Sequence, residues 1–284
     1  MIPAAFDYAA PTSLDEAVSL LQQHGDDAKI LAGGHSLLPL MKLRLAAPAL
    51  LIDLAQIPGL SYIRDQGDYV AIGAMTTYFD LEDSELLQHR IPLLVEATGM
   101  IGDPQVRNRG TLGGAMAHAD PAGDMPVVVS ALGGSVIAHG PNGDRTIDVA
   151  DFFQDIFTSA LEPEEIITEV RVRAHNNPAQ NYQKFRRRMI DWAIVGCAVN
   201  VVRSNGSIGS ASIALTNVGP TPMRAPAAEQ ALQGQQANAD AVRQAAELAD
   251  QGLEPSADLN ASTQYKKHLV KVMTRRALEA ALNL

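Results

Sequence analysis

Two glycine-rich segments are the part of this chain whose residue types and spacing could do chemistry. We call them the first glycine loop, Leu31-Ala32-Gly33-Gly34-His35-Ser36-Leu37-Leu38-Pro39, and the second glycine loop, Asn108-Arg109-Gly110-Thr111-Leu112-Gly113-Gly114-Ala115. Adjacent glycines adopt backbone conformations closed to other residues and leave no Cβ between the backbone N–H groups and a ligand, so such loops can bind phosphate. A single glycine pair usually only turns the chain. Two such loops together predict one dinucleotide site.

The sequence around the first glycine loop favours this interpretation. Residues 28–31 read as a short buried strand and residues 36–42 as a helical turn. A strand that leads through a glycine turn into a helix N-terminus points backbone N–H groups at an anion. Lys29, Lys42 and Arg44 add positive charge. The loop lacks both G-x-G-x-x-G and G-x-x-x-x-G-K-[ST], so the nucleotide must be held in another way.

Composition limits the classes of partner. The chain has 284 residues, 46% of them hydrophobic, which is enough for two or three compact subdomains. Its net charge of −10 argues against a nucleic-acid groove, which needs a concentrated basic surface. The one basic run, Lys184-Phe185-Arg186-Arg187-Arg188, is interpreted as a solvated strand end or a partner-facing patch.

The single cysteine, Cys197, excludes an internal disulfide and a cysteine-ligated iron–sulfur cluster carried by this chain alone. It lies in an apolar run, which predicts a buried, inert thiol. The histidines show no metal-ligand spacing, so we expect no metal site. The N-terminus lacks a signal pattern and no apolar stretch reaches the ~20 residues of a membrane span, so we expect a cytoplasmic protein with no transmembrane segment.

Periodicity and turn residues divide the chain into three units. The first, residues 1–56, has a helix opened by Ser13 and Glu16 at capping-box spacing. Turn signals and alternation predict the remaining elements. They are strands at 28–31 and 50–54 in the first unit, and in the second unit, 57–177, hairpins 60–64/69–73 and 135–138/146–149, a helix at 91–98 and a sheet-edge strand at 166–172.

The third unit, residues 178–284, follows a polar, turn-forming segment at 173–179. Three strands are predicted in it, with Asn205-Gly206 as the turn of the last hairpin, and residues rich in Ala, Leu, Gln, Glu and Lys then predict helices. The strands are 182–186, 193–203 and 207–217, and the helices are 226–232, 239–251 and 265–282.

Three motif groups carry a family resemblance across essentially the whole chain. They are Ala32-Gly33-Gly34-His35-Ser36-Leu37-Leu38-Pro39 with Met41-Lys42-Leu43-Arg44, then Gly110-Thr111-Leu112-Gly113-Gly114 with His118-Ala119-Asp120-Pro121 and Asp124, then Asp191-Trp192-Ala193-Ile194-Val195-Gly196. With these motifs the chain resembles the FAD-binding medium subunits of the molybdenum hydroxylase (xanthine dehydrogenase) family, and within it those of aerobic carbon monoxide dehydrogenases. The resemblance implies a mixed α/β (α+β) fold, in which two α/β subdomains clamp FAD and a C-terminal three-stranded antiparallel sheet with helices covers it.

The resemblance also implies the site residues. Pyrophosphate would lie against the two glycine loops, sugar or ribityl hydroxyls would bind two carboxylates, and Lys184 would place positive charge near the flavin. Trp192 would stack on the flavin or, alternatively, pack in the core, and His35 and His118 would support their loops. The expected FAD-binding residues are Ala32, Gly33, Gly34, His35, Ser36, Leu37, Ile101, Gly110, Thr111, Gly113, Gly114, Ala115, Asp120, Asp124, Ile167, Lys184 and Trp192.

The two phosphate-binding loops, and the lack of a cysteine or histidine placed to tether a flavin, predict non-covalent FAD. By the same resemblance this chain needs no catalytic side chain of its own. Electrons would come from a large molybdenum-binding subunit through [2Fe-2S] clusters of a small subunit and leave through FAD. The complex would be a dimer of heterotrimers. Whether its partners attach it to the inner face of the membrane is left open. Three alternatives remain: a related hydroxylase acting on an N-heterocycle or aromatic substrate, a self-sufficient FAD oxidoreductase, and a structural subunit that has lost FAD. The cluster Arg186-Arg187-Arg188 is a candidate partner contact.

Overall fold

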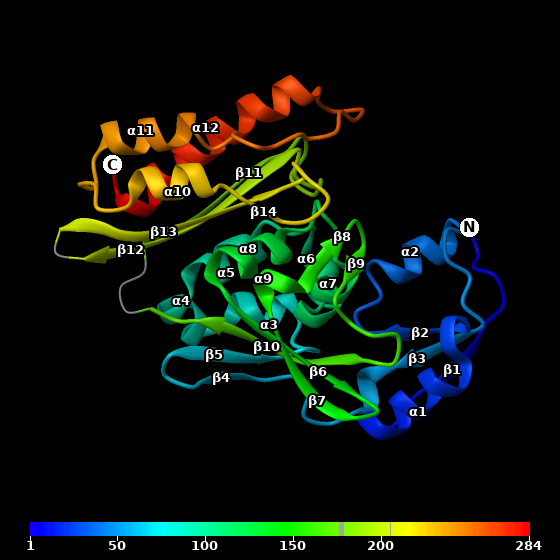
Figure 1. Cartoon of the computed structure of the whole chain (residues 1–284). Coiled ribbons are helices and arrows are strands. Elements are labelled where there is room, and N and C mark those ends of the chain that lie inside the picture. Colours follow the sequence, from blue (N-terminus) through cyan, green and yellow to red (C-terminus); the bar gives the residue numbers. More distant parts are fainter. Residues whose placement is uncertain (176–178, 205) are drawn as a thin grey trace.

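The computed structural model describes residues 1–175, 179–204 and 206–284, which form three lobes, each built on its own sheet (Figure 1). The predicted boundary at 177/178 and the turn residue Asn205 lie outside the described residues. The mixed α/β fold class is confirmed. Within the described residues no helix is long and apolar enough to cross a membrane.

The N-terminal lobe is a small parallel α/β unit. Its sheet has the order β1-β3-β2, with helix α1 packed against it and α2 following the first glycine loop. Ser13 caps α1 by accepting a hydrogen bond from the Glu16 N–H at 3.2 Å, as the capping-box spacing predicts. The elements are β1 (Asp7–Ala9), α1 (Leu14–His24), β2 (Ala28–Leu31), α2 (Leu37–Lys42) and β3 (Leu50–Asp53), with 3₁₀ turns at Gly25–Asp27 and Leu54–Gln56.

The middle lobe is built on an antiparallel five-stranded sheet of order β4-β5-β10-β6-β7. The predicted hairpins and strands are present, but the expectation that residues 166–172 form a sheet edge is wrong. Strand β10 is central because β5 and β6, which are far apart in sequence, pair with its two sides. The strands are β4 (Ile63–Asp65), β5 (Tyr69–Gly73), β6 (Gly134–Gly140), β7 (Gly143–Asp148) and β10 (Ile166–Arg173), with a small hairpin of β8 (Phe153–Asp155) and β9 (Thr158–Ser159).

Helices of the middle lobe lie between this sheet and the sheet of the C-terminal lobe (Figure 1). Tyr182, Ala198 and Ala214 of the C-terminal sheet belong to the same buried core as these helices, so the two lobes share a core. The helices are α3 (Tyr78–Asp83), α4 (Glu85–Arg90), α5 (Pro92–Gly99), α6 (Pro104–Arg107), α7 (Leu112–His118), α8 (Asp124–Leu132) and α9 (Val149–Phe152).

The C-terminal lobe has an antiparallel sheet of order β11-β12-β13-β14 covered on its outer face by three helices. The three predicted strands are present, and the expected three-stranded sheet gains a fourth, two-residue strand that pairs with β13. The elements are β11 (Ala179–Phe185), β12 (Val195–Ser204), β13 (Ser207–Thr216), β14 (Met223–Arg224), α10 (Pro226–Leu232), α11 (Ala239–Glu247) and α12 (Thr263–Leu282).

Candidate functional site

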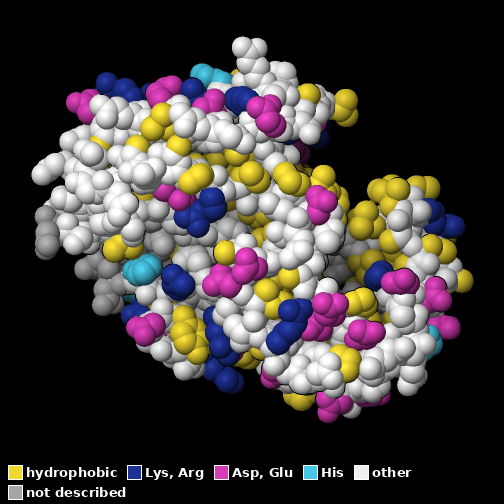
Figure 2. All heavy atoms as spheres, in the orientation of Figure 1, with side chains coloured by type: hydrophobic (Ala, Val, Ile, Leu, Met, Phe, Trp, Pro, Cys, Tyr) yellow, Lys and Arg dark blue, Asp and Glu magenta, His cyan; other side chains and the backbone are white. Residues whose placement is uncertain are grey.

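A cleft of about 740 Å³ opens between the N-terminal lobe and the rest of the molecule. Figure 2 shows the hollow, with hydrophobic side chains gathered on both of its sides. Its volume lies within the range of ligand pockets, roughly 300–1,000 Å³. All but two of the residues expected from the sequence line this cleft; Gly113 and Ile167 do not.

The first glycine loop presents backbone N–H groups to the cleft. Gly34 has φ of +77°, a left-handed conformation that favours glycine. Within the described residues, none of the backbone N–H groups of residues 33–37 donates a hydrogen bond to another protein group. His35 turns its Nδ1 back to the Gly33 carbonyl oxygen at 3.0 Å, which holds the loop as expected. Five consecutive free donors at one wall of a cleft suit an anion such as pyrophosphate.

The two glycine loops touch backbone to backbone. A Cβ added at Gly33 would lie 2.1 Å from the carbonyl oxygen of Arg109, so only glycine allows this approach. A Cβ at Gly114 would lie 2.7 Å from the Oγ1 of Thr111. The sequence explains these glycines by close access for a ligand. The structure adds a second reason, which is close packing between the loops at Gly33 and within the second loop at Gly114.

The second glycine loop differs from the sequence expectation in how its N–H groups are used. Thr111 caps helix α7, so Gly113 and Gly114 lie in a helix rather than in an open loop. The N–H of Gly113 donates to the Ala74 carbonyl at 2.9 Å, and the N–H of Gly114 donates to Thr111 Oγ1 at 3.1 Å. Gly113 also lies outside the cleft, because its Cα packs on Ala74. This loop supplies a wall of small residues, Gly110, Thr111, Gly114 and Ala115, rather than a second set of free donors.

Asp120 lies at the cleft with one oxygen committed to the protein. Its Oδ1 accepts the N–H of Ala122 at 2.8 Å, and its Oδ2 faces His118 Nε2 at 4.0 Å. Burial lowers the pKa of His118 against the opposing effect of Asp120, which favours the neutral ring. The ring centroid of His118 also lies 5.0 Å from that of Phe157. Oδ2 of Asp120 is thus the carboxylate oxygen that is open to a hydroxyl donor.

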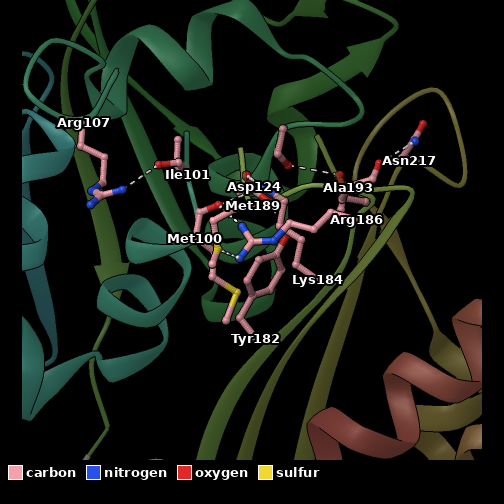
Figure 3. A network of polar contacts seen from close by, with 12 residues as sticks. Met100, Ile101, Arg107, Asp124, Tyr182, Lys184, Arg186, Met189, Ala193 and Asn217 are labelled. Carbon is pink, nitrogen blue, oxygen red and sulfur yellow. Dashed lines mark hydrogen bonds and ion pairs between the residues drawn. The ribbon is translucent and has the colours of Figure 1, made fainter. Parts of the chain in front are cut away.

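Asp124 is placed differently from the sequence expectation. It is buried, its Oδ1 accepts the Tyr182 hydroxyl at 2.5 Å and its Oδ2 pairs with Lys184 Nζ at 2.8 Å (Figure 3). Burial raises the pKa of the Asp124 carboxyl above its ordinary range, against the opposing effect of Lys184. Both carboxylate oxygens of Asp124 thus have a protein partner, and its expected role in binding a sugar hydroxyl stays a prediction.

The same network changes the expectation for the basic residues. The charge of Lys184 is balanced by Asp124, and its Nζ also donates to the Met100 carbonyl at 3.2 Å. The half-buried Arg186 donates to the same carbonyl at 2.8 Å, so its guanidinium has a partner within this chain (Figure 3). Arg187 donates to Asn260 Oδ1 at 2.9 Å. Within the expected arginine cluster, Arg186 thus bonds to the backbone next to the cleft residue Ile101.

The expected flavin-facing hydrophobic residues divide into two kinds. Ile101 and Trp192 line the cleft, and Trp192 is 58% exposed, so the alternative that it packs in the core is wrong. Ile167 is 5% exposed and belongs to the core of the middle lobe, so it does not line the cleft. Its place on the buried face of the central strand β10 explains the difference.

Some cleft residues were not expected from the sequence. Tyr78 lies beneath Gly110, where an added Cβ would meet its ring at 2.7 Å, and Glu162 and Ile190 line the cleft from connecting segments. The segments that hold Glu162 and Ile190 have no glycine pattern, and only the fold brings them to the cleft. A tyrosine directly after a capping threonine is the one local signal for Tyr78, and it predicts a helix start rather than a site.

Comparison with known proteins assigns the family. A model described as the FAD binding domain in molybdopterin dehydrogenase matches residues 4–173, and one described as the CO dehydrogenase flavoprotein C-terminal domain matches residues 180–281. The chain belongs to this family. The family prediction made from the three motif groups is confirmed.

Known relatives match this chain along nearly its whole length. The carbon monoxide dehydrogenase medium chain of Hydrogenophaga pseudoflava is 46% identical over 99% of this chain and 98% of its own. That of Afipia carboxidovorans is 40% identical over the same shares. A solved carbon monoxide dehydrogenase structure from Hydrogenophaga pseudoflava matches with a TM-score of 0.96 and 48% identity, covering 99% of this chain and 98% of that one.

Proposed function

We propose that this chain is the FAD-carrying electron-transfer subunit of a molybdenum hydroxylase complex of the carbon monoxide dehydrogenase type. The observation that carries the proposal is the row of free N–H groups at residues 33–37, set at one wall of a cleft between lobes. Backbone donors free of side chains suit the pyrophosphate of a dinucleotide. The relatives named carbon monoxide dehydrogenase medium chains support the choice within the family.

The residues of the cleft would hold FAD in distinct ways. The first glycine loop would bind the pyrophosphate, and the bare backbone at Gly110 and Gly114 would let it approach. Asp120 Oδ2 would accept a hydroxyl, and Trp192 would lie against the flavin ring. FAD, when bound, supplies the exchange between one-electron and two-electron transfer. Within the described residues we assign no side chain a role in bond making or breaking.

The remaining partner assignments follow from the same proposal. The complex would include a large molybdenum-binding subunit and a small subunit with [2Fe-2S] clusters, assembled as a dimer of heterotrimers in the cytoplasm. We also propose the subdomain division 1–56, 57–177 and 178–284, supported by the separate sheets of the three lobes. Co-purification with mass measurement of the intact complex tests the assembly, and cell fractionation tests the location.

Substrate-driven flavin reduction is the decisive test of function. The full chain is prepared alone and together with its partner subunits, carbon monoxide is added without oxygen, and flavin absorbance is followed. We expect bleaching of the flavin in the complex and none in the isolated chain. Bleaching in the isolated chain would instead support a self-sufficient FAD oxidoreductase. Bleaching by an N-heterocycle but not by carbon monoxide would support a related hydroxylase, and a colourless complex would support a structural subunit.

Acid precipitation tests the proposal that FAD is held without a covalent bond. The only cysteine, Cys197, is buried, and burial raises its pKa to about 12, so a thiolate tether at this position is unsupported. We expect all flavin in the supernatant as FAD. Flavin retained in the pellet would contradict the proposal.

A further inference from the structure

Asn217 lies just after strand β13 and connects two segments that line the cleft. Its side-chain Nδ2 donates to the carbonyl oxygens of Ala193 at 2.8 Å and Ile194 at 3.3 Å, directly after Trp192. Its backbone N–H donates to the Pro121 carbonyl at 2.8 Å, in the segment that carries Asp120. One residue therefore holds both the tryptophan segment and the carboxylate segment of the cleft.

Neighbouring groups fix Asn217 itself. Nζ of the buried Lys266, on α12, lies 3.3 Å from the backbone oxygen of Asn217 and 3.5 Å from its Oδ1. The same Nζ pairs with Asp258 at 2.8 Å. The hydroxyl of Thr216 donates to the Pro121 carbonyl at 2.7 Å. The outer helix α12 is thus joined through Asn217 to the wall of the cleft.

The Trp192 ring is 58% exposed, whereas Ala193 and Ile194 after it are buried and the Ile194 N–H donates to the Phe185 carbonyl at 2.8 Å. A second hollow, of about 340 Å³, lies against Trp192 and is lined also by Asn217, Arg187 and Asn260. Trp192 thus has open space beside it in addition to the cleft, and no packed core fixes the ring. The hydrogen bonds from Asn217 to the Ala193 and Ile194 carbonyls therefore add to the burial of these two residues in setting the position of the ring.

We propose that Asn217, braced by Lys266, is a positioning residue that sets the place of Trp192 at the cleft and so the strength of FAD binding. The inference rests on the proposed function only for the identity of the ligand. Asparagine suits the position for two reasons. Its φ is +61°, a left-handed conformation that asparagine tolerates better than most residues, and its amide supplies the donor that the two carbonyls need.

Fluorescence of the full chain gives a direct test, because Trp192 is the only tryptophan. Asn217→Asp keeps the shape but replaces the donor with a carboxylate oxygen, and Lys266→Met removes the brace. In both variants we expect lower Trp192 anisotropy, weaker quenching of its emission by FAD and an FAD dissociation constant raised about tenfold. Asn283→Asp, at a left-handed position with φ of +58° at the end of α12, and Lys267→Met, next to Lys266 but half-buried and paired with Glu254, are matched controls.

The outcomes separate this inference from the proposed function. If wild-type chain binds no FAD, the proposed function fails, while the anisotropy of Trp192 in the ligand-free variants still tests the anchor. If Asn217→Asp does not fold, Asn217→Gly keeps the left-handed backbone and removes the same donor. Anisotropy and FAD affinity at control values in the folded Asn217 variant and in Lys266→Met would overturn the inference.

Discussion

Replacing Gly33 with alanine tests whether the contact between the two glycine loops builds the site. The added Cβ would lie 2.1 Å from the carbonyl oxygen of Arg109, whereas ordinary contact begins at 3.4 Å, so the loops would have to separate by the difference, about 1.3 Å. The obstacle is backbone, which cannot rotate away as a side chain can. Overpacking of this kind costs about 1–3 kcal/mol. If about 1.4 kcal/mol of it falls on the bound state, FAD affinity drops about tenfold.

Two measurements on the Gly33→Ala chain check this reasoning: thermal unfolding without FAD, and the FAD dissociation constant by flavin fluorescence. Gly99→Ala is the matched control, because Gly99 lies in α5 and its added Cβ meets only the flexible tip of Glu82 at 3.4 Å. We expect the control to keep its affinity and to gain slightly in stability, since alanine is the better helix former. Wild-type affinity and stability in Gly33→Ala would refute the claim that the loops are packed this closely.

Three further predictions concern charge. The Nδ1 of His139 lies 2.6 Å from Asp144, and its Nε2 lies 3.2 Å from Asp15 of α1. Burial lowers the pKa of His139, but the two carboxylates outweigh burial and raise it. The stabilisation of the fold by this ion pair is therefore full below the ordinary histidine pKa and is lost as pH rises through the raised pKa. His139→Gln should therefore destabilise the chain more at about pH 5.5 than at about pH 8.5 in thermal unfolding, and an equal loss at both would contradict this. Tyr182→Phe leaves the buried Asp124 oxygen without its donor and should cost about 1–3 kcal/mol in denaturant unfolding, with no change counting against the network. Raising salt from about 0.05 to about 0.5 M should not weaken FAD binding in titrations, and a several-fold weakening would show that lysine or arginine charge holds the pyrophosphate.

Local sequence signals predicted the elements they govern. Ser13 capping, the glycine turn after residue 31 and the hairpin turns at 65–68 and 141–144 depend on neighbouring residues, and these features are present. The place of β10 could not be predicted in this way. Its alternating pattern reflects a strand with one face on the helices, which is the same for an edge and a central strand; only pairing with β5 and β6 makes it central.

The carboxylates of the site show the same limit. Asp120 and Asp124 are equally polar and close in sequence, so the sequence gives no reason to separate them. The fold does separate them, because Tyr182 and Lys184 of β11 reach Asp124 from the C-terminal lobe. Contacts between residues this far apart in the chain leave no local signal. The tryptophan segment is similar, since its anchor, Asn217, lies in another part of the sequence.

The charges of the cleft explain why backbone donors, rather than lysines, should bind the pyrophosphate. One of the two lysines that line it, Lys184, is neutralised by Asp124, and carboxylates outnumber cations along the wall. An anion in such a cleft is repelled by the carboxylates and attracted chiefly by the N–H dipoles of residues 33–37, which need no counterion and act at contact distance. Salt would then screen repulsion at least as much as attraction. With the pairs Asp124–Lys184 and Glu165–Arg145 set aside, the charged lining consists of Asp26, Asp120, Glu162 and Asp191, against Lys29.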